Sequence, residues 1–413
     1  MSVLSLISSR RRRPTFFLLL VAAVFTFLYT SNRIFYTPPT SIPSAPRPDA
    51  GSGPDGQAPD EEDGQEQEEQ QEQDDIHLEY RTSSRPGFNG YGQLTKLGKL
   101  PEEHLPAQGN NKRLIVIGDV HGMITPLQAL LAKIGFSAES GNDHLVFVGN
   151  MVSEGPDSAA VVELAQSVKA SGVRGVHEDR VLLAREASSS DQEAHDDLQQ
   201  QHLSHGDYDD RIVAEALSPQ NVQYLSSFPV ILELGYIPIL QNAFAVHAGL
   251  VPGLELEKQD PWPAMHMHSV VYPREAARRE NAKKKVEEDI KNRSWFSFAS
   301  RRSKEALIDE EYERTKRPWD RDLVLPVDDY SGENWAKAWD VFEALRNEGE
   351  RRTVFYGHDT KNGLNIGTYA IGLNTKCVFG GQLSAFVISG GASGVEHETV
   401  QVDCEQEAKE VEE

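Results

Sequence analysis

The sequence has little cysteine and a deficit of positive charge. Cys377 and Cys404 are the two cysteines in 413 residues, which excludes a disulfide-dense scaffold and a cysteine-based zinc module. A single disulfide remains open if the folded part lies outside the cytosol. Lys and Arg number 41 against 64 Asp and Glu, giving a formal net charge of −23. This balance lacks the basic face of a duplex nucleic-acid binder, so we expect no nucleic-acid partner.

The N-terminus, residues 1–36, has the composition of a membrane anchor. The basic cluster Arg10–Arg13 precedes an apolar run that ends at Thr30, and basic residues before such a run keep that end in the cytosol. Pro14 to Thr30 would span about 26 Å as a helix, close to the roughly 27 Å core of a thin endomembrane bilayer. A cleaved signal peptide is the alternative, but Thr30–Arg33 is a poor cleavage site. We therefore expect a single-pass type II membrane protein whose body faces an endomembrane or vacuolar lumen.

Low-complexity composition separates this anchor from the folded part. Residues 37–108 are rich in Pro, Gly and acidic residues, and no Lys or Arg stands between Asp55 and Glu79. Such a segment has too few apolar residues to form a core, so we predict a disordered linker. A folded domain is predicted over 109–405, with a polar surface insertion at 274–317 and an acidic tail at 406–413.

The alternation of strand, loop and helix begins at Lys112. The predicted elements are strands at 114–117, 144–148, 243–246 and 353–356, and helices at 125–134 and 158–171. This order indicates an α/β fold with sites at the ends of strands. No repeat of fixed period is visible, and the length suffices for one large domain or two ordinary ones.

Four polar residues that follow these strands form a candidate metal site. Asp119 and His121 follow the first strand, while His247 and His358 follow the third and fourth. Residues two apart in an extended turn face the same way, so Asp119 and His121 can reach one ion. Carboxylate and imidazole ligands suit Zn, Mn or Fe. One such histidine alone is more often a satisfied buried side chain, but the four together favour a divalent metal site.

The motifs around these residues resemble those of the calcineurin-like metallophosphoesterases. They are Gly118–Gly122 (GDVHG), Gly149–Ser158 (GNMVSEGPDS), Arg174–Asp179 (RGVHED), His247–Gly253 (HAGLVPG) and Tyr356–Asp359 (YGHD). The chain looks most similar to the membrane-anchored fungal endopolyphosphatases, a branch related to bacterial diadenosine tetraphosphatases and Ser/Thr phosphatases. The resemblance covers about Lys112 to Ile388, with the insertion looped out.

This resemblance implies a β-sandwich of mixed sheets flanked by helices. It also implies two divalent ions that clamp a phosphate while a bridging hydroxide attacks phosphorus. The metal ligands that it assigns are Asp119 and His121 for the first ion, and His247 and His358 for the second. It assigns His177 to protonation of the leaving oxygen and Arg174 to binding of phosphate oxygens.

Three positions depart from the family pattern, and all belong to this site. Asn150 stands where the family has the carboxylate that bridges both metals, and Val176 stands where it has an Asn ligand. Glu154 replaces a basic residue and places negative charge where phosphate would dock. A neutral amide bridges poorly, and two unbridged divalent ions repel each other strongly. We therefore expect one ion rather than two, with Asp119, His121 and Asn150 as its ligands.

Two functions agree with these features. The first is a metal-dependent phosphoesterase of impaired activity that hydrolyses phosphoanhydride or phosphomonoester bonds, in polyphosphate or phosphoprotein. The alternative is an inactive pseudophosphatase that binds a phosphate-containing ligand or a partner protein. The substrate stays open, because polyphosphate, dinucleoside polyphosphate and phosphoprotein differ in groove shape rather than in metal motif.

Overall fold

The computed structural model describes residues 94–189, 205–292 and 303–405. All of them belong to one unit, Gln67–Glu413. The predicted membrane anchor, most of the predicted linker and the acidic tail lie outside the described residues. Among the helices that are described, none is long and apolar enough to cross a membrane.

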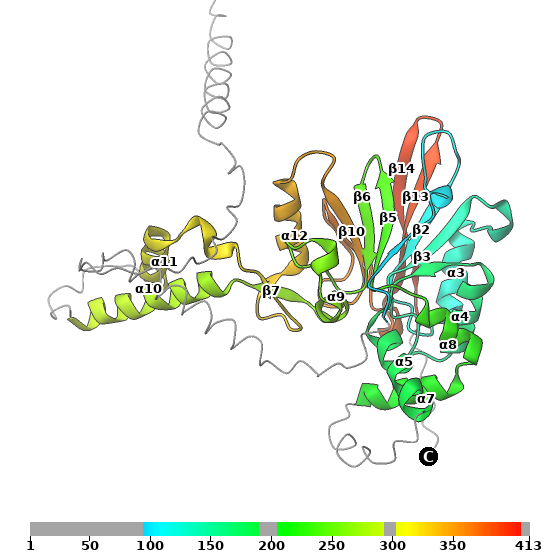
Figure 1. Cartoon of the computed structure of the whole chain (residues 1–413), viewed down its shortest axis with the longest axis horizontal. Coiled ribbons are helices and arrows are strands. Elements are labelled where there is room, and N and C mark those ends of the chain that lie inside the picture. Colours follow the sequence, from blue (N-terminus) through cyan, green and yellow to red (C-terminus); the bar gives the residue numbers. More distant parts are fainter. Residues whose placement is uncertain (1–93, 190–204, 293–302, 406–413) are drawn as a thin grey trace, which may run out of the picture. The chain divides into compact units, whose positions relative to one another are not determined.

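Two mixed β-sheets form the centre of the domain (Figure 1). The first has the strand order β14 (Gly394–Asp403), β13 (Gln382–Gly391), β2 (Arg113–Ile117), β3 (Asp143–Phe147) and β4 (Ser171–Gly172). The second has the order β1 (Leu97–Lys99), β5 (Ile231–Ile237), β6 (Gln241–Val246), β10 (Arg352–Tyr356), β12 (Ala370–Gly372) and β11 (Asn365–Ile366). A small third sheet consists of β8 (Leu325–Val327), β7 (Ser269–Val271) and β9 (Glu333–Asn334).

Side chains of β2 alternate between two hydrophobic cores. Ile115 and Ile117 pack in the core that the first sheet shares with its helices, whereas Leu114 and Val116 pack between the two sheets. This follows from the pleat, which points successive side chains to opposite faces. The run is apolar throughout because the strand is buried on both faces.

Helices cover the outer face of each sheet (Figure 1). The first sheet carries α3 (Ile124–Ile134), α4 (Ser158–Ser167), α5 (Val176–Ser189), α7 (His205–Ala216) and α8 (Pro219–Ser226). The second packs against α9 (Pro261–His266) and α12 (Trp335–Ala344). The buried indoles of Trp335 and Trp339 belong to a third hydrophobic core, which lies between the second sheet and these two helices. The predicted α/β fold with mixed sheets flanked by helices is confirmed.

Two predicted boundaries differ from the structure. β1 lies within the predicted linker and pairs in parallel with β5, Leu97 opposite Ile231, so ordered chain begins before residue 109. The helix predicted over 158–171 ends at Ser167. Lys169 has a φ of 55°, which does not continue a right-handed helix, and Ser171 belongs to β4.

The predicted polar insertion is a pair of helices, α10 (Pro273–Asn292) and α11 (Lys304–Thr315). Ion pairs join them, among them Lys285 Nζ to Glu311 Oε1 at 2.9 Å and Arg279 Nη1 to Asp309 Oδ1 at 3.1 Å. Their exposed faces are highly charged, which agrees with a surface insertion.

Cys377 and Cys404 form a disulfide that joins the segment before β13 to the end of β14. The two residues are 27 apart in sequence, and closing a loop of this size stabilises a fold by about 3.5 kcal/mol in the chain-entropy treatment. We expect the double substitution Cys377→Ser and Cys404→Ser to lower the free energy of unfolding in urea by about 2–4 kcal/mol. The unsubstituted chain under reducing conditions is the control, and an unchanged free energy in both would contradict the prediction.

Candidate functional site

The structure brings together the polar residues that follow β2, β6 and β10. The backbone N–H of His358 donates to both carboxylate oxygens of Asp119, at 3.2 and 3.1 Å. His121 Nε2 lies 3.8 Å from Asp119 Oδ2, and the rings of His247 and His358 are 5.0 Å apart. A Cβ on Gly357 would overlap Asp119 Oδ1, so glycine at this strand end permits the approach of Asp119.

Several residues of the site adopt left-handed backbone conformations. They are His121 (φ 50°), Asn150 (50°), Ser153 (71°), Glu154 (64°) and His358 (59°). A non-glycine residue in this region costs of order 1–3 kcal/mol and persists where surrounding contacts enforce it. Such residues concentrate at functional sites, so their presence indicates that the functional site lies at this end of the sheets.

Asp119 is buried and is surrounded by neutral donors. Its Oδ2 accepts hydrogen bonds from Asn150 Nδ2 at 3.2 Å and from Asn374 Nδ2 at 2.9 Å, besides the His358 N–H. Burial raises the pKa of Asp119 to about 8, and the nearby Glu178 adds to the shift, while the His358 N–H and Asn150 oppose it. The carboxyl group is therefore satisfied by protein donors on both oxygens.

Asn150 connects three parts of the site. Its Nδ2 donates to Asp119, and its Oδ1 accepts the backbone N–H of His177 at 3.2 Å. Its backbone carbonyl accepts the N–H groups of Val120 and His121. The oxygen of the side-chain amide thus accepts a hydrogen bond from α5, and its nitrogen donates one to Asp119.

Glu178 holds two loops in place from the first turn of α5. Its Oε2 accepts N–H groups of Asn150 at 2.8 Å and Gly175 at 2.9 Å. Its Oε1 accepts those of Met151 at 2.7 Å and Val152 at 3.3 Å. Burial raises the pKa of Glu178, and these N–H donors oppose the shift. One buried carboxylate therefore fixes the backbone that carries Asn150.

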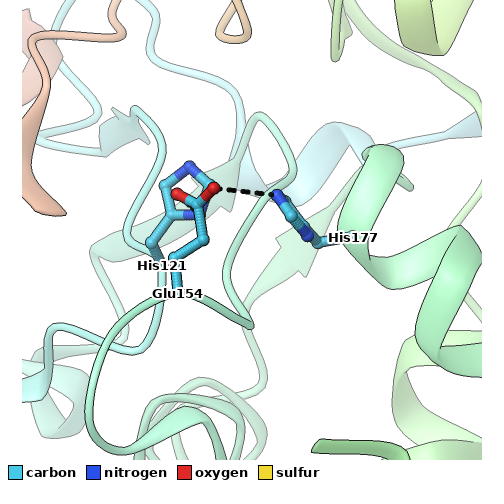
Figure 2. Close-up of side chains that lie close together, drawn as sticks. All are labelled: His121, Glu154 and His177. Carbon is cyan, nitrogen blue, oxygen red and sulfur yellow. Dashed lines mark ion pairs between the residues drawn. The ribbon is translucent and has the colours of Figure 1, made fainter. Parts of the chain in front are cut away.

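His177 lies between two carboxylates. Its Nδ1 is 2.8 Å from Oδ1 of the buried Asp210, on α7, and its Nε2 is 3.7 Å from Glu154 Oε1. Burial lowers the pKa of His177, but the hydrogen bond and charge of Asp210, with Glu154, outweigh burial and raise it overall. Glu154 Oε2 also lies 3.3 Å from His121 Nδ1. Figure 2 shows these three side chains and the ion pair between Glu154 and His177.

Arg174, expected to bind phosphate, contacts other groups. Its Nη1 pairs with Asp179 Oδ1 at 3.2 Å, and its Nη2 lies 3.5 Å from the carbonyl oxygen of Ser226. Its side chain is 12% exposed, and its buried Nε makes no hydrogen bond. The guanidinium is thus tied to the α5–α8 side of the site.

A second group of histidines adjoins His247 and His358. His247 Nδ1 bonds the carbonyl of Val148 at 2.8 Å, and burial lowers its pKa to about 3. His358 Nε2 lies 3.1 Å from the carbonyl of His266, and its ring stacks on His268 at 4.3 Å. His247 Nε2 is buried without a hydrogen bond and can bind a ligand.

The side chains of the site offer fewer free ligand atoms than the pair of divalent ions implied by the resemblance would use. Both oxygens of Asp119 are engaged by N–H donors, the oxygen of Asn150 accepts from His177, and Val176 offers no ligand atom. Within the described residues, Asp119, His121, His247 and His358 include no trio of ligand atoms within 4.8 Å of one another. His121, Glu154 and His177 do form such a trio.

Sequence reasoning assigned no role to Asp210, Glu178 or Asn374. Asp210 follows a polar stretch that carries no motif, so nothing local indicates its contact with His177 across 33 residues. Glu178 stands inside the motif that includes His177, and its four N–H partners come from loop geometry. Glu154 was expected to repel phosphate, and the structure places it against two imidazoles.

Comparison with known proteins gives a consistent family match. The profile described as "Calcineurin-like phosphoesterase" matches residues 112–362. The symmetrical bis(5'-nucleosyl)-tetraphosphatase of Janthinobacterium sp. is 27% identical over 71% of this chain and 97% of its own length. The symmetrical bis(5'-nucleosyl)-tetraphosphatase of Ralstonia nicotianae is 28% identical over 70% of this chain and 93% of its own length. Serine/threonine-protein phosphatase 1 of Salmonella typhimurium is 36% identical over 20% of this chain and 37% of its own.

Proposed function

Because this chain belongs to the calcineurin-like phosphoesterase family, we propose that it is a phosphoesterase whose two-metal hydrolysis is strongly reduced. The observation that carries the proposal is the hydrogen bond from Asn150 Nδ2 to Asp119 Oδ2. A carboxylate at position 150 would repel that of Asp119 unless a cation or a shared proton lay between them, whereas the amide satisfies Asp119 without either. The divalent ions that the family uses are therefore weakly held at Asp119.

The substrate class that we propose is a phosphoanhydride such as a dinucleoside polyphosphate. The support is the pair of tetraphosphatases that align with about 70% of this chain. Inorganic polyphosphate, expected from the likeness to endopolyphosphatases, and phosphoprotein are the substrates to compare. Glu154 stands where the resemblance implies a basic residue, so we propose that the histidines of the site position the phosphate.

A second candidate function is an inactive pseudophosphatase that binds a phosphate-containing ligand or a partner protein. The observation that favours it is the position of His177. His177 is the residue expected to protonate a leaving oxygen, and its Nε2 lies 3.7 Å from Glu154 Oε1. A proton on that nitrogen is directed at a carboxylate of the protein.

The proposal includes a type II membrane location with the domain in an endomembrane or vacuolar lumen. The support is the basic cluster and apolar run near the N-terminus. The disulfide Cys377–Cys404 adds to it, because disulfides persist in oxidising compartments.

Phosphate release by the full chain tests the proposed function. The substrates are diadenosine tetraphosphate, polyphosphate and p-nitrophenyl phosphate, each with Mn²⁺. We expect Asp119→Ala to change kcat/KM for each of them by less than about threefold, because the natural chain has little two-metal catalysis. Loss of an interaction made in the transition state would instead lower kcat. A fall of 100-fold or more in Asp119→Ala would show a competent metal site at Asp119 and overturn the proposal.

A further inference from the structure

His121, a ligand in the family's set, forms a compact group of metal-ligating atoms with two side chains outside that set, Glu154 and His177. His121, Glu154 and His177 each offer one ligand atom, and these atoms all lie within 4.8 Å of one another. Within the described residues, this is the single group of three or more His, Cys, Asp or Glu with that property. Figure 2 shows the Glu154 carboxylate beside both imidazoles.

The donor types and the short contacts of these side chains suit zinc. Glu154 Oε2 lies 3.3 Å from His121 Nδ1, and Glu154 Oε1 lies 3.7 Å from His177 Nε2. Ligand bonds of about 2.0–2.1 Å at tetrahedral angles separate ligand atoms by about 3.3 Å. Two histidines with one carboxylate leave the fourth position to water or a bound oxygen, which is the ligand count of open zinc sites.

The imidazoles of His121 and His177 are buried, and each has a ring nitrogen near Glu154. His121 Nδ1 is buried and makes no hydrogen bond in the structure, and leaving a buried polar atom unpaired is costly. The side chain of His121 is 8% exposed, and that of His177 is 10% exposed. A cation at this point would give the unpaired nitrogen its partner.

Asp210 supplies the outer support that metal-binding histidines usually have. It accepts from His177 Nδ1 at 2.8 Å, and its side chain is 1% exposed. A carboxylate on the far nitrogen fixes the tautomer that leaves Nε2 free to bind metal. It also fixes the ring orientation and increases the basicity of the ligand.

This group differs from the Asp119 site in the nitrogen of His121 that it uses. His121 Nε2 lies 3.8 Å from Asp119 Oδ2, while Nδ1 faces Glu154. The two nitrogens lie on different sides of the imidazole ring, so an ion bound by Glu154 and His177 is held independently of Asp119. Glu154 also lines a groove of about 260 Å³ between residues 154–159 and 212–217.

We propose that His121 Nδ1, Glu154 and His177 Nε2 bind one Zn²⁺ ion at a position that does not require Asp119. Two neutral imidazoles and the Glu154 carboxylate give the ligands a charge of −1 against the +2 of the ion, and the open fourth position can take an anionic oxygen. Glu154, which stands where the resemblance implies a basic residue, is then a metal ligand. The proposal goes beyond phosphoester hydrolysis and stands whether or not the chain hydrolyses phosphate.

Zinc binding by the full chain tests the proposal directly. The chain is freed of metal with a chelator and titrated with Zn²⁺, and bound metal is counted by mass spectrometry. Binding of Co²⁺ is followed by the visible absorption of its four-coordinate form. We expect one tight ion per natural chain, and Glu154→Gln and His177→Gln should each weaken binding by about 100-fold or more, since changes to outer partners alone cost about 10–100-fold.

The matched control is Asp119→Asn, which removes a ligand of the family site and none of the proposed one. We expect its zinc affinity to stay within about threefold of the natural chain, and His358→Gln serves the same purpose if Asp119→Asn does not fold. Loss of zinc in these controls with retention in Glu154→Gln would place the ion at Asp119 and overturn the proposal. Absence of zinc binding by the folded natural chain would overturn it too. These experiments measure zinc binding and not phosphate release. A failure of the zinc proposal is therefore distinguishable from a failure of the proposed function, which the phosphate assay tests.

Discussion

The double substitution Asn150→Asp with Val176→Asn is expected to increase phosphoester hydrolysis by about 100-fold or more. A metal that acts as a Lewis acid lowers a phosphoryl-transfer barrier by several kcal/mol, and each 1.36 kcal/mol is tenfold in rate. A carboxylate at 150 would stand about as close to Asp119 Oδ2 as the amide does now, at 3.2 Å. Two carboxylates at this distance repel each other unless a cation or a shared proton lies between them, and a divalent cation can replace the proton.

The measurement is kcat/KM for p-nitrophenyl phosphate and diadenosine tetraphosphate with Mn²⁺, together with the metal content of the variant. We also expect the variant to need metal for stability, because the uncompensated carboxylate pair destabilises the fold when no ion is bound. Its melting temperature should rise on addition of Mn²⁺ more than that of the natural chain. An unchanged rate with two metals bound would show that the loss of the bridge is not what limits hydrolysis.

Asn374→Asp is the matched control for this prediction. Asn374 donates to the same oxygen, Asp119 Oδ2, at 2.9 Å, so the substitution adds a carboxylate beside the same group. The resemblance assigns no metal to position 374, and we expect no gain in hydrolysis. Adding Asp119→Ala to the double variant should abolish the gain, which distinguishes metal catalysis at Asp119 from an effect of charge alone.

The sequence predicted those parts of the fold and site that depend on local composition. The apolar run at 114–117 is buried on both faces, so its strand was placed within one residue of β2. β1 was missed because Leu97–Lys99 has no apolar pattern and pairs only through β5. The residues that follow strand ends were found because Gly and His or Asp stand together there.

The directions of side chains in the site were beyond sequence reasoning. Glu154 has a φ of 64°, and this backbone conformation turns its carboxylate toward His121 and His177. The partner of His177, Asp210, comes from a helix 33 residues away. Asn150 was expected to be a ligand of the remaining ion, and in the structure its amide joins Asp119 to α5. Such contacts depend on tertiary packing that a motif does not contain.

Glu178→Gln is expected to destabilise the domain by about 3–5 kcal/mol, because it removes the charge while keeping the shape. Each carboxylate oxygen of Glu178 accepts two backbone N–H groups. In either orientation of the glutamine, its NH₂ group would face two N–H donors, which leaves both unpaired in the interior. An unpaired buried donor costs about 1–3 kcal/mol. The measurement is the free energy of unfolding in urea at pH 7.

The same substitution should loosen the loop that carries Asn150, because three of the N–H donors belong to residues 150–152. Faster amide hydrogen exchange at these residues, with little change in β13 and β14, is the expected local signature. Glu163→Gln on the exposed face of α4 is the control for loss of one negative charge, and its effect should stay within about 0.5 kcal/mol. Equal effects of the two substitutions would mean that the carboxylate of Glu178 does not hold the loop. In that case the geometry of Asn150 would have to come from its own contacts with Asp119 and His177.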